Sequence, residues 1–176
     1  MVAESVAAAG SCTAEDSYEV GDILRDEYGE ASLNVGDEGG YNHLGVDDPR
    51  EAFDLELRAV EACGYDGEFA LAADVAASHF YDPEAGTYAL LGESMTRDEL
   101  LDFYGELVAD YPVVSLEDPL DQHDFAGVAA LTDRLDIQIV GDDLFTTNPE
   151  RLGEGIDRGA ANALLWKVNQ VGTVTE

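Results

Sequence analysis

The chain has 176 residues, of which 39 are acidic and eight are basic, and its formal net charge is −31. A surface with this charge repels phosphate backbones and anionic lipids, so the composition disfavours a nucleic-acid-binding or peripheral-membrane protein. Apolar residues make up 45 % of the chain, which is ordinary for a folded domain and argues against disorder.

The charged residues are typical of a protein that works in concentrated salt. Lys167 is the only lysine in the chain. Self-repulsion among so many carboxylates destabilises a compact state in dilute buffer, whereas near 1 M salt the Debye length falls to about 3 Å. No apolar stretch approaches the roughly 18 residues of a transmembrane helix, and the N-terminus lacks the pattern of a signal peptide. We therefore expect a soluble, cytoplasmic protein from a halophile.

In chain order, we expect a loose N-terminal segment over residues 1–16 and a helix that ends near Tyr28. A glycine-rich stretch, NVGDEGG, follows at 34–40. From there, amphipathic helices alternate with short apolar runs, and the helices begin with capping residues: Asp48 with Glu51, Thr96 with Glu99, and Asn148. The predicted helices are 48–64, 96–111, 124–134 and 148–159, and the predicted strands are 68–76, 112–117, 137–143 and 163–169. This alternation predicts an α/β fold with a parallel sheet covered on both faces.

An ionisable residue follows the apolar run of each predicted strand. These residues are Asp74, Glu117, Asp142 and Lys167, and the last three are spaced 25 residues apart. In parallel α/β folds, and above all in (β/α)8 barrels, the carboxyl ends of the strands form the rim that holds the active site. The alternative is that each acid only caps the next helix, which is worth about 0.3–1 kcal/mol. Three acids and a lysine at matching positions favour the first interpretation.

Carboxylates that converge without a cation raise one another's pKa, and Mg2+ prefers oxygen ligands of this kind. Asp74, Glu117 and Asp142 therefore form a candidate Mg2+ site. Beside such a cation the pKa of Lys167 would be lowered toward the range of a general base, which an arginine cannot reach. A lysine base beside a metal suits removal of a proton α to a carboxylate.

The remaining candidates favour ordinary roles. Cys12 and Cys63 form no CxxC pair, so two free thiols are favoured over a zinc site or a disulfide. We expect the three histidines, His43, His79 and His123, to be surface or loop residues.

Five motifs resemble the enolase family, in order and in spacing. They are NVGDEGG (34–40), LAADVAAS (71–78), VVSLEDP (113–119), QIVGDDLFTTNP (138–149) and LLWKVNQVGTVTE (164–176). The resemblance implies a partial TIM-type (β/α)8 barrel over residues 17–176. It also implies dehydration of 2-phosphoglycerate to phosphoenolpyruvate in glycolysis and gluconeogenesis, with Mg2+ as the cofactor. The protein partner that it implies is either another copy of the chain, in a homo-oligomer, or a complementary enolase chain.

The resemblance also assigns roles to single residues. Asp74, Glu117 and Asp142 match the metal ligands, and Glu117 and Asp142 also lie near the substrate. Lys167 matches the base that takes the C2 proton, and Glu38 matches the acid that assists departure of the C3 hydroxyl. On the residues alone, GDEGG would instead be interpreted as a turn.

The chain departs from the family pattern at Tyr41–Asp48, His79 and Trp166. We also find no match to the N-terminal enolase domain, nor to the later barrel segments that bind the substrate's carboxylate and phosphate. Two hypotheses stay open. The chain is either part of a split or truncated enzyme, or a non-catalytic enolase-like fragment that binds Mg2+ or a partner chain.

Overall fold

The computed structural model describes residues 5–37, 39–42, 45–46, 48–173 and 175. The chain divides into two compact units, residues 1–70 and 71–176. The first unit holds helices α1 (Val6–Tyr28) and α2 (Pro49–Ala62), with a 3-10 turn at Glu30–Leu33 after α1. None of the helices in the described residues has the length and apolar character to cross a membrane.

Helix α1 begins at Val6, eleven residues before residue 17, where we expected the folded part of the chain to begin. Residues 1–16 were expected to be loose, but Ser5 caps a helix that already includes Val6 to Asp16, and its side chain accepts a hydrogen bond from the amide of Ala8. The small residues of this segment, mostly alanine, are favourable in a helix. Their weak apolar pattern therefore hid a strong helical propensity.

Helix α2 starts as predicted, with Asp48 as its cap and Pro49 at the first position. The Glu51 carboxylate, expected to complete a capping box, accepts a hydrogen bond from the hydroxyl of Tyr28 in α1 instead. The core of this unit lies between α1 and α2 and contains the buried residues Val20, Leu24, Leu55 and Ala59.

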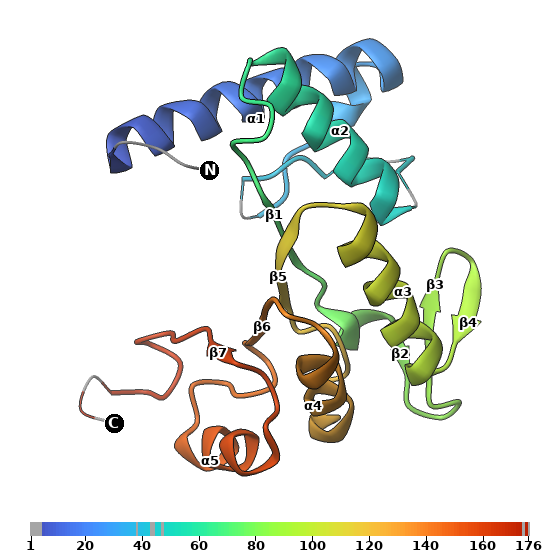
Figure 1. Ribbon diagram of the computed structural model, residues 1–176, viewed down its shortest axis with the longest axis vertical. Helices are drawn as coiled ribbons and strands as arrows, with labels where there is room; N and C mark the ends of the chain where they lie inside the picture. The colour runs from blue at the N-terminus through green and yellow to red at the C-terminus, as the bar shows by residue number, and fades with distance from the viewer. Residues whose placement is uncertain (1–4, 38, 43–44, 47, 174, 176) are drawn as a thin grey trace. The chain divides into compact units, whose positions relative to one another are not determined.

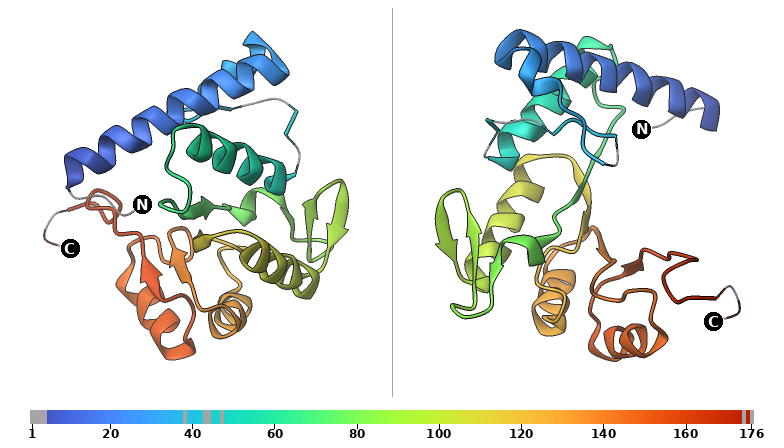
Figure 2. Two further views of the ribbon diagram at one scale, coloured as in Figure 1. Left: turned by 45° about the horizontal axis from the view of Figure 1, so that its top comes forward. Right: turned by 180° about the vertical axis from the view of Figure 1, so that it is seen from behind.

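The second unit contains a parallel sheet with the strand order β1-β5-β6-β7. The strands are β1 (Leu71–Asp74), β5 (Val113–Glu117), β6 (Gln138–Gly141) and β7 (Ala163–Leu164). Helices α3 (Arg97–Asp110), α4 (Phe125–Arg134) and α5 (Pro149–Arg158) alternate with them as predicted, and lie along one side of the sheet (Figure 2). Among the described residues the sheet is open, with β1 and β7 at its edges.

Only one face of this sheet is well covered. Leu116 and Ile139 are fully buried in the core of the second unit, together with Leu100 of α3 and Leu131 of α4. On the other side, Ala72 of β1 and Gln138 of β6 are exposed, and both are register partners of Ser115 in β5. Our expectation of two covered faces is therefore wrong for the described residues.

A small antiparallel sheet that we did not predict lies between β1 and α3. It consists of β2 (Tyr81–Asp82), β3 (Thr87–Leu90) and β4 (Glu93–Met95). Tyr88 of β3 is 1 % exposed, and its hydroxyl accepts a hydrogen bond from the amide of Asp121. This contact joins the small sheet to the loop that follows β5. The strands are two to four residues long, which is too short to show a clear period in the sequence.

Two carboxyl groups in the first unit predict an unusual pH dependence of stability. Asp16 of α1 is 8 % exposed and its Oδ1 has no hydrogen-bond partner. Burial raises the pKa of Asp16 above 3.8, and burial together with the charge of Asp16 raises the pKa of Glu56 above 4.5. Because the folded state holds these protons more tightly than the unfolded state, the free energy of unfolding falls as the pH rises above these values.

We therefore expect Glu56→Gln to reduce the loss of stability between pH 4 and neutral pH, measured by urea unfolding at constant salt. Glu61→Gln is the matched control, because it removes the same charge from an exposed position of the same helix. Equal effects of the two substitutions would show that general repulsion, and not burial, causes the pH dependence.

Candidate metal and catalytic site

The carboxyl ends of β1, β5 and β6 bring the predicted acids together. Asp74 and Glu117 are register partners at the ends of β1 and β5. Asp142 directly follows β6, the next strand in the sheet. The structure therefore confirms that these three acids lie on neighbouring strands at one edge of the sheet. Their roles as metal ligands stay a prediction.

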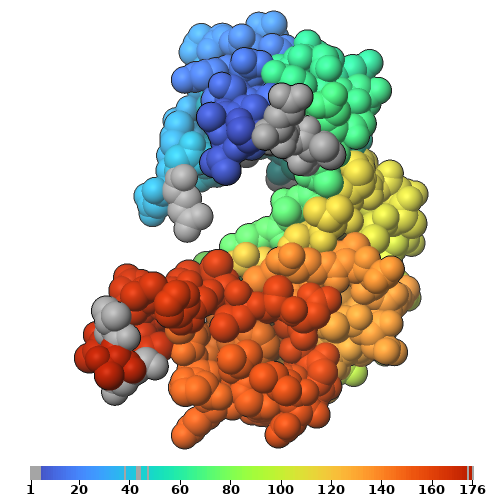
Figure 3. Space-filling model, turned by 60° about the vertical axis from the view of Figure 1, so that its left-hand side comes forward, coloured from blue at the N-terminus to red at the C-terminus, as the bar shows by residue number. Residues whose placement is uncertain are grey.

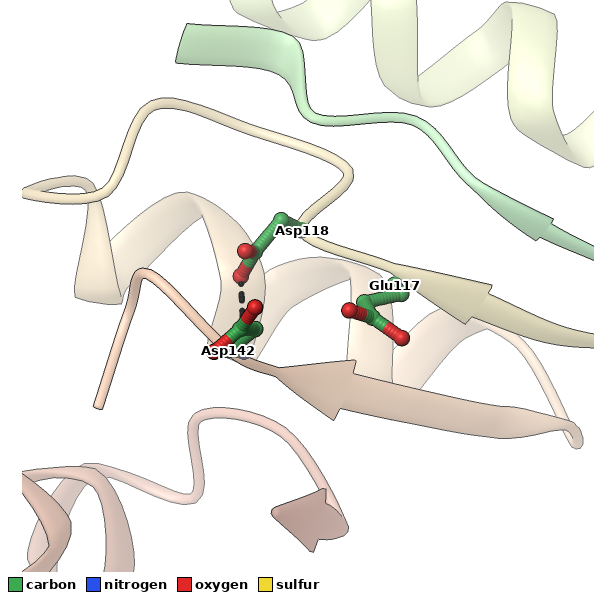
Figure 4. Close-up of side chains that lie close together, drawn as sticks. All are labelled: Glu117, Asp118 and Asp142. Carbon is green, nitrogen blue, oxygen red and sulfur yellow. Dashed lines mark hydrogen bonds between the residues drawn. The ribbon is translucent and has the colours of Figure 1, made fainter. Parts of the chain in front are cut away.

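The tightest cluster contains an acid that we did not select. Carboxylate oxygens of Glu117, Asp118 and Asp142 lie within 4.8 Å of one another (Figure 4). Asp118 is 6 % exposed and accepts hydrogen bonds from the backbone amides of Asp142 (3.1 Å), Asp143 (2.7 Å) and Leu144 (3.4 Å). The motif VVSLEDP contains this second acid, directly before a proline at the end of a strand. An acid at that position, next to the predicted ligand Glu117, was the sequence signal that could have identified Asp118.

Asp142 is nearly buried, at 9 % exposed, and its two oxygens differ. Oδ2 accepts a hydrogen bond from Nζ of Lys167 at 2.5 Å, whereas Oδ1 is buried and has no hydrogen-bond partner. A buried carboxylate oxygen without a partner is costly unless something else satisfies it. Within the cluster of Glu117, Asp118 and Asp142, Oδ1 of Asp142 is therefore the atom that a cation would satisfy most directly.

The strand that was expected to carry Lys167 is short. β7 contains only Ala163 and Leu164, and Lys167 lies in the irregular segment that follows, at the surface of the second unit (red in Figure 3). Lys167 itself helps to hold this segment: its Nζ donates to Asp142, and its amide donates to Oγ1 of Thr147 at 3.1 Å. The lysine thus reaches the acidic cluster, as predicted from the spacing, but from a loop.

Burial and the neighbouring charged groups shift the pKa values of three residues at the site. Burial raises the pKa of Glu117 to about 7, with further contributions from Asp74, Asp142 and Asp118. Burial also raises the pKa of Asp118, which its three backbone donors partly offset. The hydrogen bond to Asp142 raises the pKa of Lys167. The lower pKa that we expected for Lys167 was tied to a neighbouring cation, and it stays a prediction.

Local sequence explains how the loop after β6 approaches the cluster. Gly141 ends the strand, and a Cβ there would lie 2.6 Å from the ring of Phe145. Any larger residue would therefore push the loop away from its packing position. The next turn closes through hydrogen bonds from the amides of Phe145 and Thr146 to the carbonyl of Asp142.

The remaining residues singled out in the sequence are Glu38, the histidines and the cysteines. Glu38 and His43 lie outside the described residues. His79 and His123 are exposed, as expected, and Cys12 and Cys63 are free thiols.

The departures from the family pattern have different surroundings. Tyr41, within the divergent stretch, packs against Gly21 of α1, where a Cβ would lie 2.3 Å from the tyrosine hydroxyl. Trp166 is 66 % exposed.

Comparisons with known proteins agree with this geometry. The family model "Enolase, C-terminal TIM barrel domain" matches residues 1–176. The chain belongs to the enolase family. The match includes residues 1–16, so the family resemblance begins earlier than the motif comparison indicated.

Curated relatives named enolase match nearly the whole chain. The chain is 52 % identical to the enolase of Methanopyrus kandleri over 177 residues, which cover 98 % of the chain and 41 % of that relative. It is 48 % identical to the enolase of Methanocaldococcus jannaschii over 99 % of the chain and 40 % of the relative. The corresponding values for Thermococcus kodakarensis are 46 %, 88 % and 36 %. The chain thus spans about 40 % of the length of the relatives it matches.

The contacts of Thr147 generate a prediction about the segment that carries Lys167. Thr147 accepts from the Lys167 amide and donates to Oε1 of Gln170 at 2.6 Å. Thr147→Val removes both hydrogen bonds at nearly constant shape, and losing one such bond costs about 1 kcal/mol. We expect amide hydrogen exchange of Lys167 to accelerate roughly fivefold, because about 1 kcal/mol corresponds to that factor.

Thr146→Val is the matched control. Thr146 has the same left-handed backbone, with φ of 50° against 52° for Thr147, but its hydroxyl donates to the carbonyl of its neighbour Phe145. An equal acceleration in both variants would show that Thr147 does not hold the lysine segment.

Proposed function

We propose that this chain supplies the metal ligands, the acid and the base of an enolase that dehydrates 2-phosphoglycerate to phosphoenolpyruvate. The observation that carries the proposal is the cluster at the strand ends, where Asp142 offers a buried oxygen without a partner beside Glu117 and within reach of Lys167. Family membership supports the reaction class. Because the chain spans about 40 % of its relatives, the activity of the whole enzyme is part of the proposal.

The donor set fits Mg2+, which prefers carboxylate oxygens. Asp74, Glu117 and Asp142 would hold the ion, and the unsatisfied Oδ1 of Asp142 supports this assignment. Burial, and after it the charges of the neighbouring acids, raise the pKa of Glu117, and a divalent cation would offset the repulsion among these acids. When bound, the ion supplies positive charge that stabilises the negative charge developing on the substrate's carboxylate.

The proposed reaction needs one proton acceptor and one proton donor from the chain. Lys167 takes the proton from C2 of 2-phosphoglycerate, and Glu38 gives a proton to the departing C3 hydroxyl. The C2–H and C3–O bonds break, a C2–C3 double bond forms, and water leaves. An amine is required at position 167 because an arginine keeps its proton at any working pH. This requirement accounts for the single lysine in a chain that otherwise uses arginine.

The exposed apolar side chains favour a second candidate function. Val114 of β5 is 51 % exposed and Trp166, which follows the edge strand β7, is 66 % exposed. Exposed apolar residues near an unpaired sheet edge are typical of a surface that binds another chain. A non-catalytic fragment that binds Mg2+ or a complementary enolase chain is therefore the alternative. For either candidate, the composition favours a cytoplasm with concentrated salt.

Metal binding tests the proposed ligands. We expect Asp142→Ala to weaken Mg2+ binding, measured calorimetrically in molar KCl. The loss of affinity should exceed the roughly 10–100-fold that follows from removing a residue that only orients a metal ligand. Asp143→Ala is the matched control, since Asp143 is the neighbouring acid but lies outside the carboxylate cluster. Equal affinities for Asp142→Ala and the unmodified chain would exclude the proposed site.

Turnover tests the proposed base. Phosphoenolpyruvate formation is measured with the chain alone. It is also measured after mixing the chain with the segments of a related enolase that lie outside the region matched by this chain. In the preparation that is active, we expect Lys167→Arg to lower kcat by about 10²–10⁴-fold, the usual contribution of a general base. Trp166→Leu, a change at the exposed neighbouring residue, should leave kcat within the same range as the unmodified chain.

Each outcome of this assay bears on one candidate function. If both preparations are folded and inactive, the catalytic proposal fails and the binding alternative remains. If Lys167→Arg turns over normally, Lys167 is not the base.

A further inference from the structure

We propose that Asp118 is a positioning residue: it holds the loop after β6 so that Asp142 faces the metal site, and it does not bind the metal itself. This inference rests on the proposed function. The observation behind it is the contrast between two neighbouring carboxylates. Both oxygens of Asp118 accept backbone hydrogen bonds, whereas Oδ1 of Asp142 has no partner.

The three backbone hydrogen bonds that the Asp118 carboxylate accepts come from the segment that carries Asp142. Oδ1 accepts from the amides of Asp142 and Leu144, and Oδ2 accepts from the amide of Asp143. Three consecutive amides bound by one carboxylate fix the backbone direction of this segment. A charged acceptor makes these bonds stronger than bonds between neutral groups. The side chain of Asp142 is thereby directed toward Glu117 (Figure 4).

The backbone of Asp118 is itself held in a strained conformation. Its φ is 40°, in the left-handed region that few residues other than glycine adopt. Its amide donates to the carbonyl of Val140 at 3.0 Å, and its carbonyl accepts from the amide of Ala77 at 3.0 Å. The next carbonyl, that of Pro119, accepts from the buried hydroxyl of Tyr104 at 2.7 Å. Strain that is fixed by so many contacts is typical of functional sites.

These contacts connect all three strand ends. Asp118 follows β5, its carbonyl binds the segment after β1, its amide binds β6, and its carboxylate binds the loop after β6. The residue therefore sets the spacing among the strands that carry Asp74, Glu117 and Asp142. Three of the roughly four acceptor positions of the Asp118 carboxylate are already used by amides of the segment that carries Asp142.

Mn2+ titration of the full chain tests this role, with the metal affinity measured by electron paramagnetic resonance in molar KCl. Asp118→Asn replaces one acceptor oxygen with an N–H donor that faces backbone donors. We expect the affinity for Mn2+ to fall about 10–100-fold, as for other groups that orient metal ligands. Val128→Ala is the control, because it removes buried apolar volume from α4 and should leave the affinity unchanged.

Hydrogen exchange of the unmodified chain distinguishes positioning from ligation and does not depend on whether Asp118→Asn folds. We expect the amides of Asp142 and Asp143 to keep their protection when Mg2+ is saturating. Loss of protection on adding Mg2+ would show that Asp118 turns toward the metal, and would overturn the inference.

The titration also separates this inference from the proposed function. If Asp118→Asn is folded and binds Mn2+ as tightly as the unmodified chain, the inference is wrong while the metal site stands. If the unmodified chain binds no Mn2+, the proposed metal site is wrong and the inference is overturned with it.

Discussion

Carboxylates that converge at one edge of a sheet repel one another, and the arrangement around Glu117, Asp118 and Asp142 depends on how that repulsion is offset. Within the chain, two kinds of group provide the offset. The amine of Lys167 binds one oxygen of Asp142, and three backbone amides bind Asp118. For Glu117, burial and then the charges of the neighbouring acids raise the pKa to about 7. A divalent cation would remove the repulsion that remains among these carboxylates. The arrangement of the strand ends thereby leads to the proposed metal-dependent chemistry.

Much of this site could be predicted from the sequence, because strand ends are visible in it. Apolar runs that stop at an acid mark the points where parallel strands leave the sheet, and the spacing of 25 residues between Glu117, Asp142 and Lys167 marks repeated strand–helix units. The helix caps at Asp48, Thr96 and Asn148 were equally visible, because side-chain capping depends on residues close in sequence.

The errors have physical causes. The N-terminal half of α1 was not predicted because an alanine-rich segment lacks an apolar stripe even when its helical propensity is high. The short strand β7 was expected to reach Lys167, since the apolar run ALLWKVN does not show where sheet pairing stops. Asp118 and Thr147 were not selected because their roles rest on hydrogen bonds to backbone amides more than 19 residues away in sequence. Such contacts depend on the path of the loops, which local patterns do not specify.

The central claim is that the strand ends of β1, β5 and β6 form a divalent-metal site. The most direct test is a crystal structure of the chain grown with Mn2+ and recorded at an energy where manganese scatters anomalously. We predict an anomalous peak among Asp74, Glu117 and Asp142, with Asp118 still bound to the three amides. No peak at these residues in crystals that contain Mn2+, or a peak coordinated by Asp118, would contradict the account.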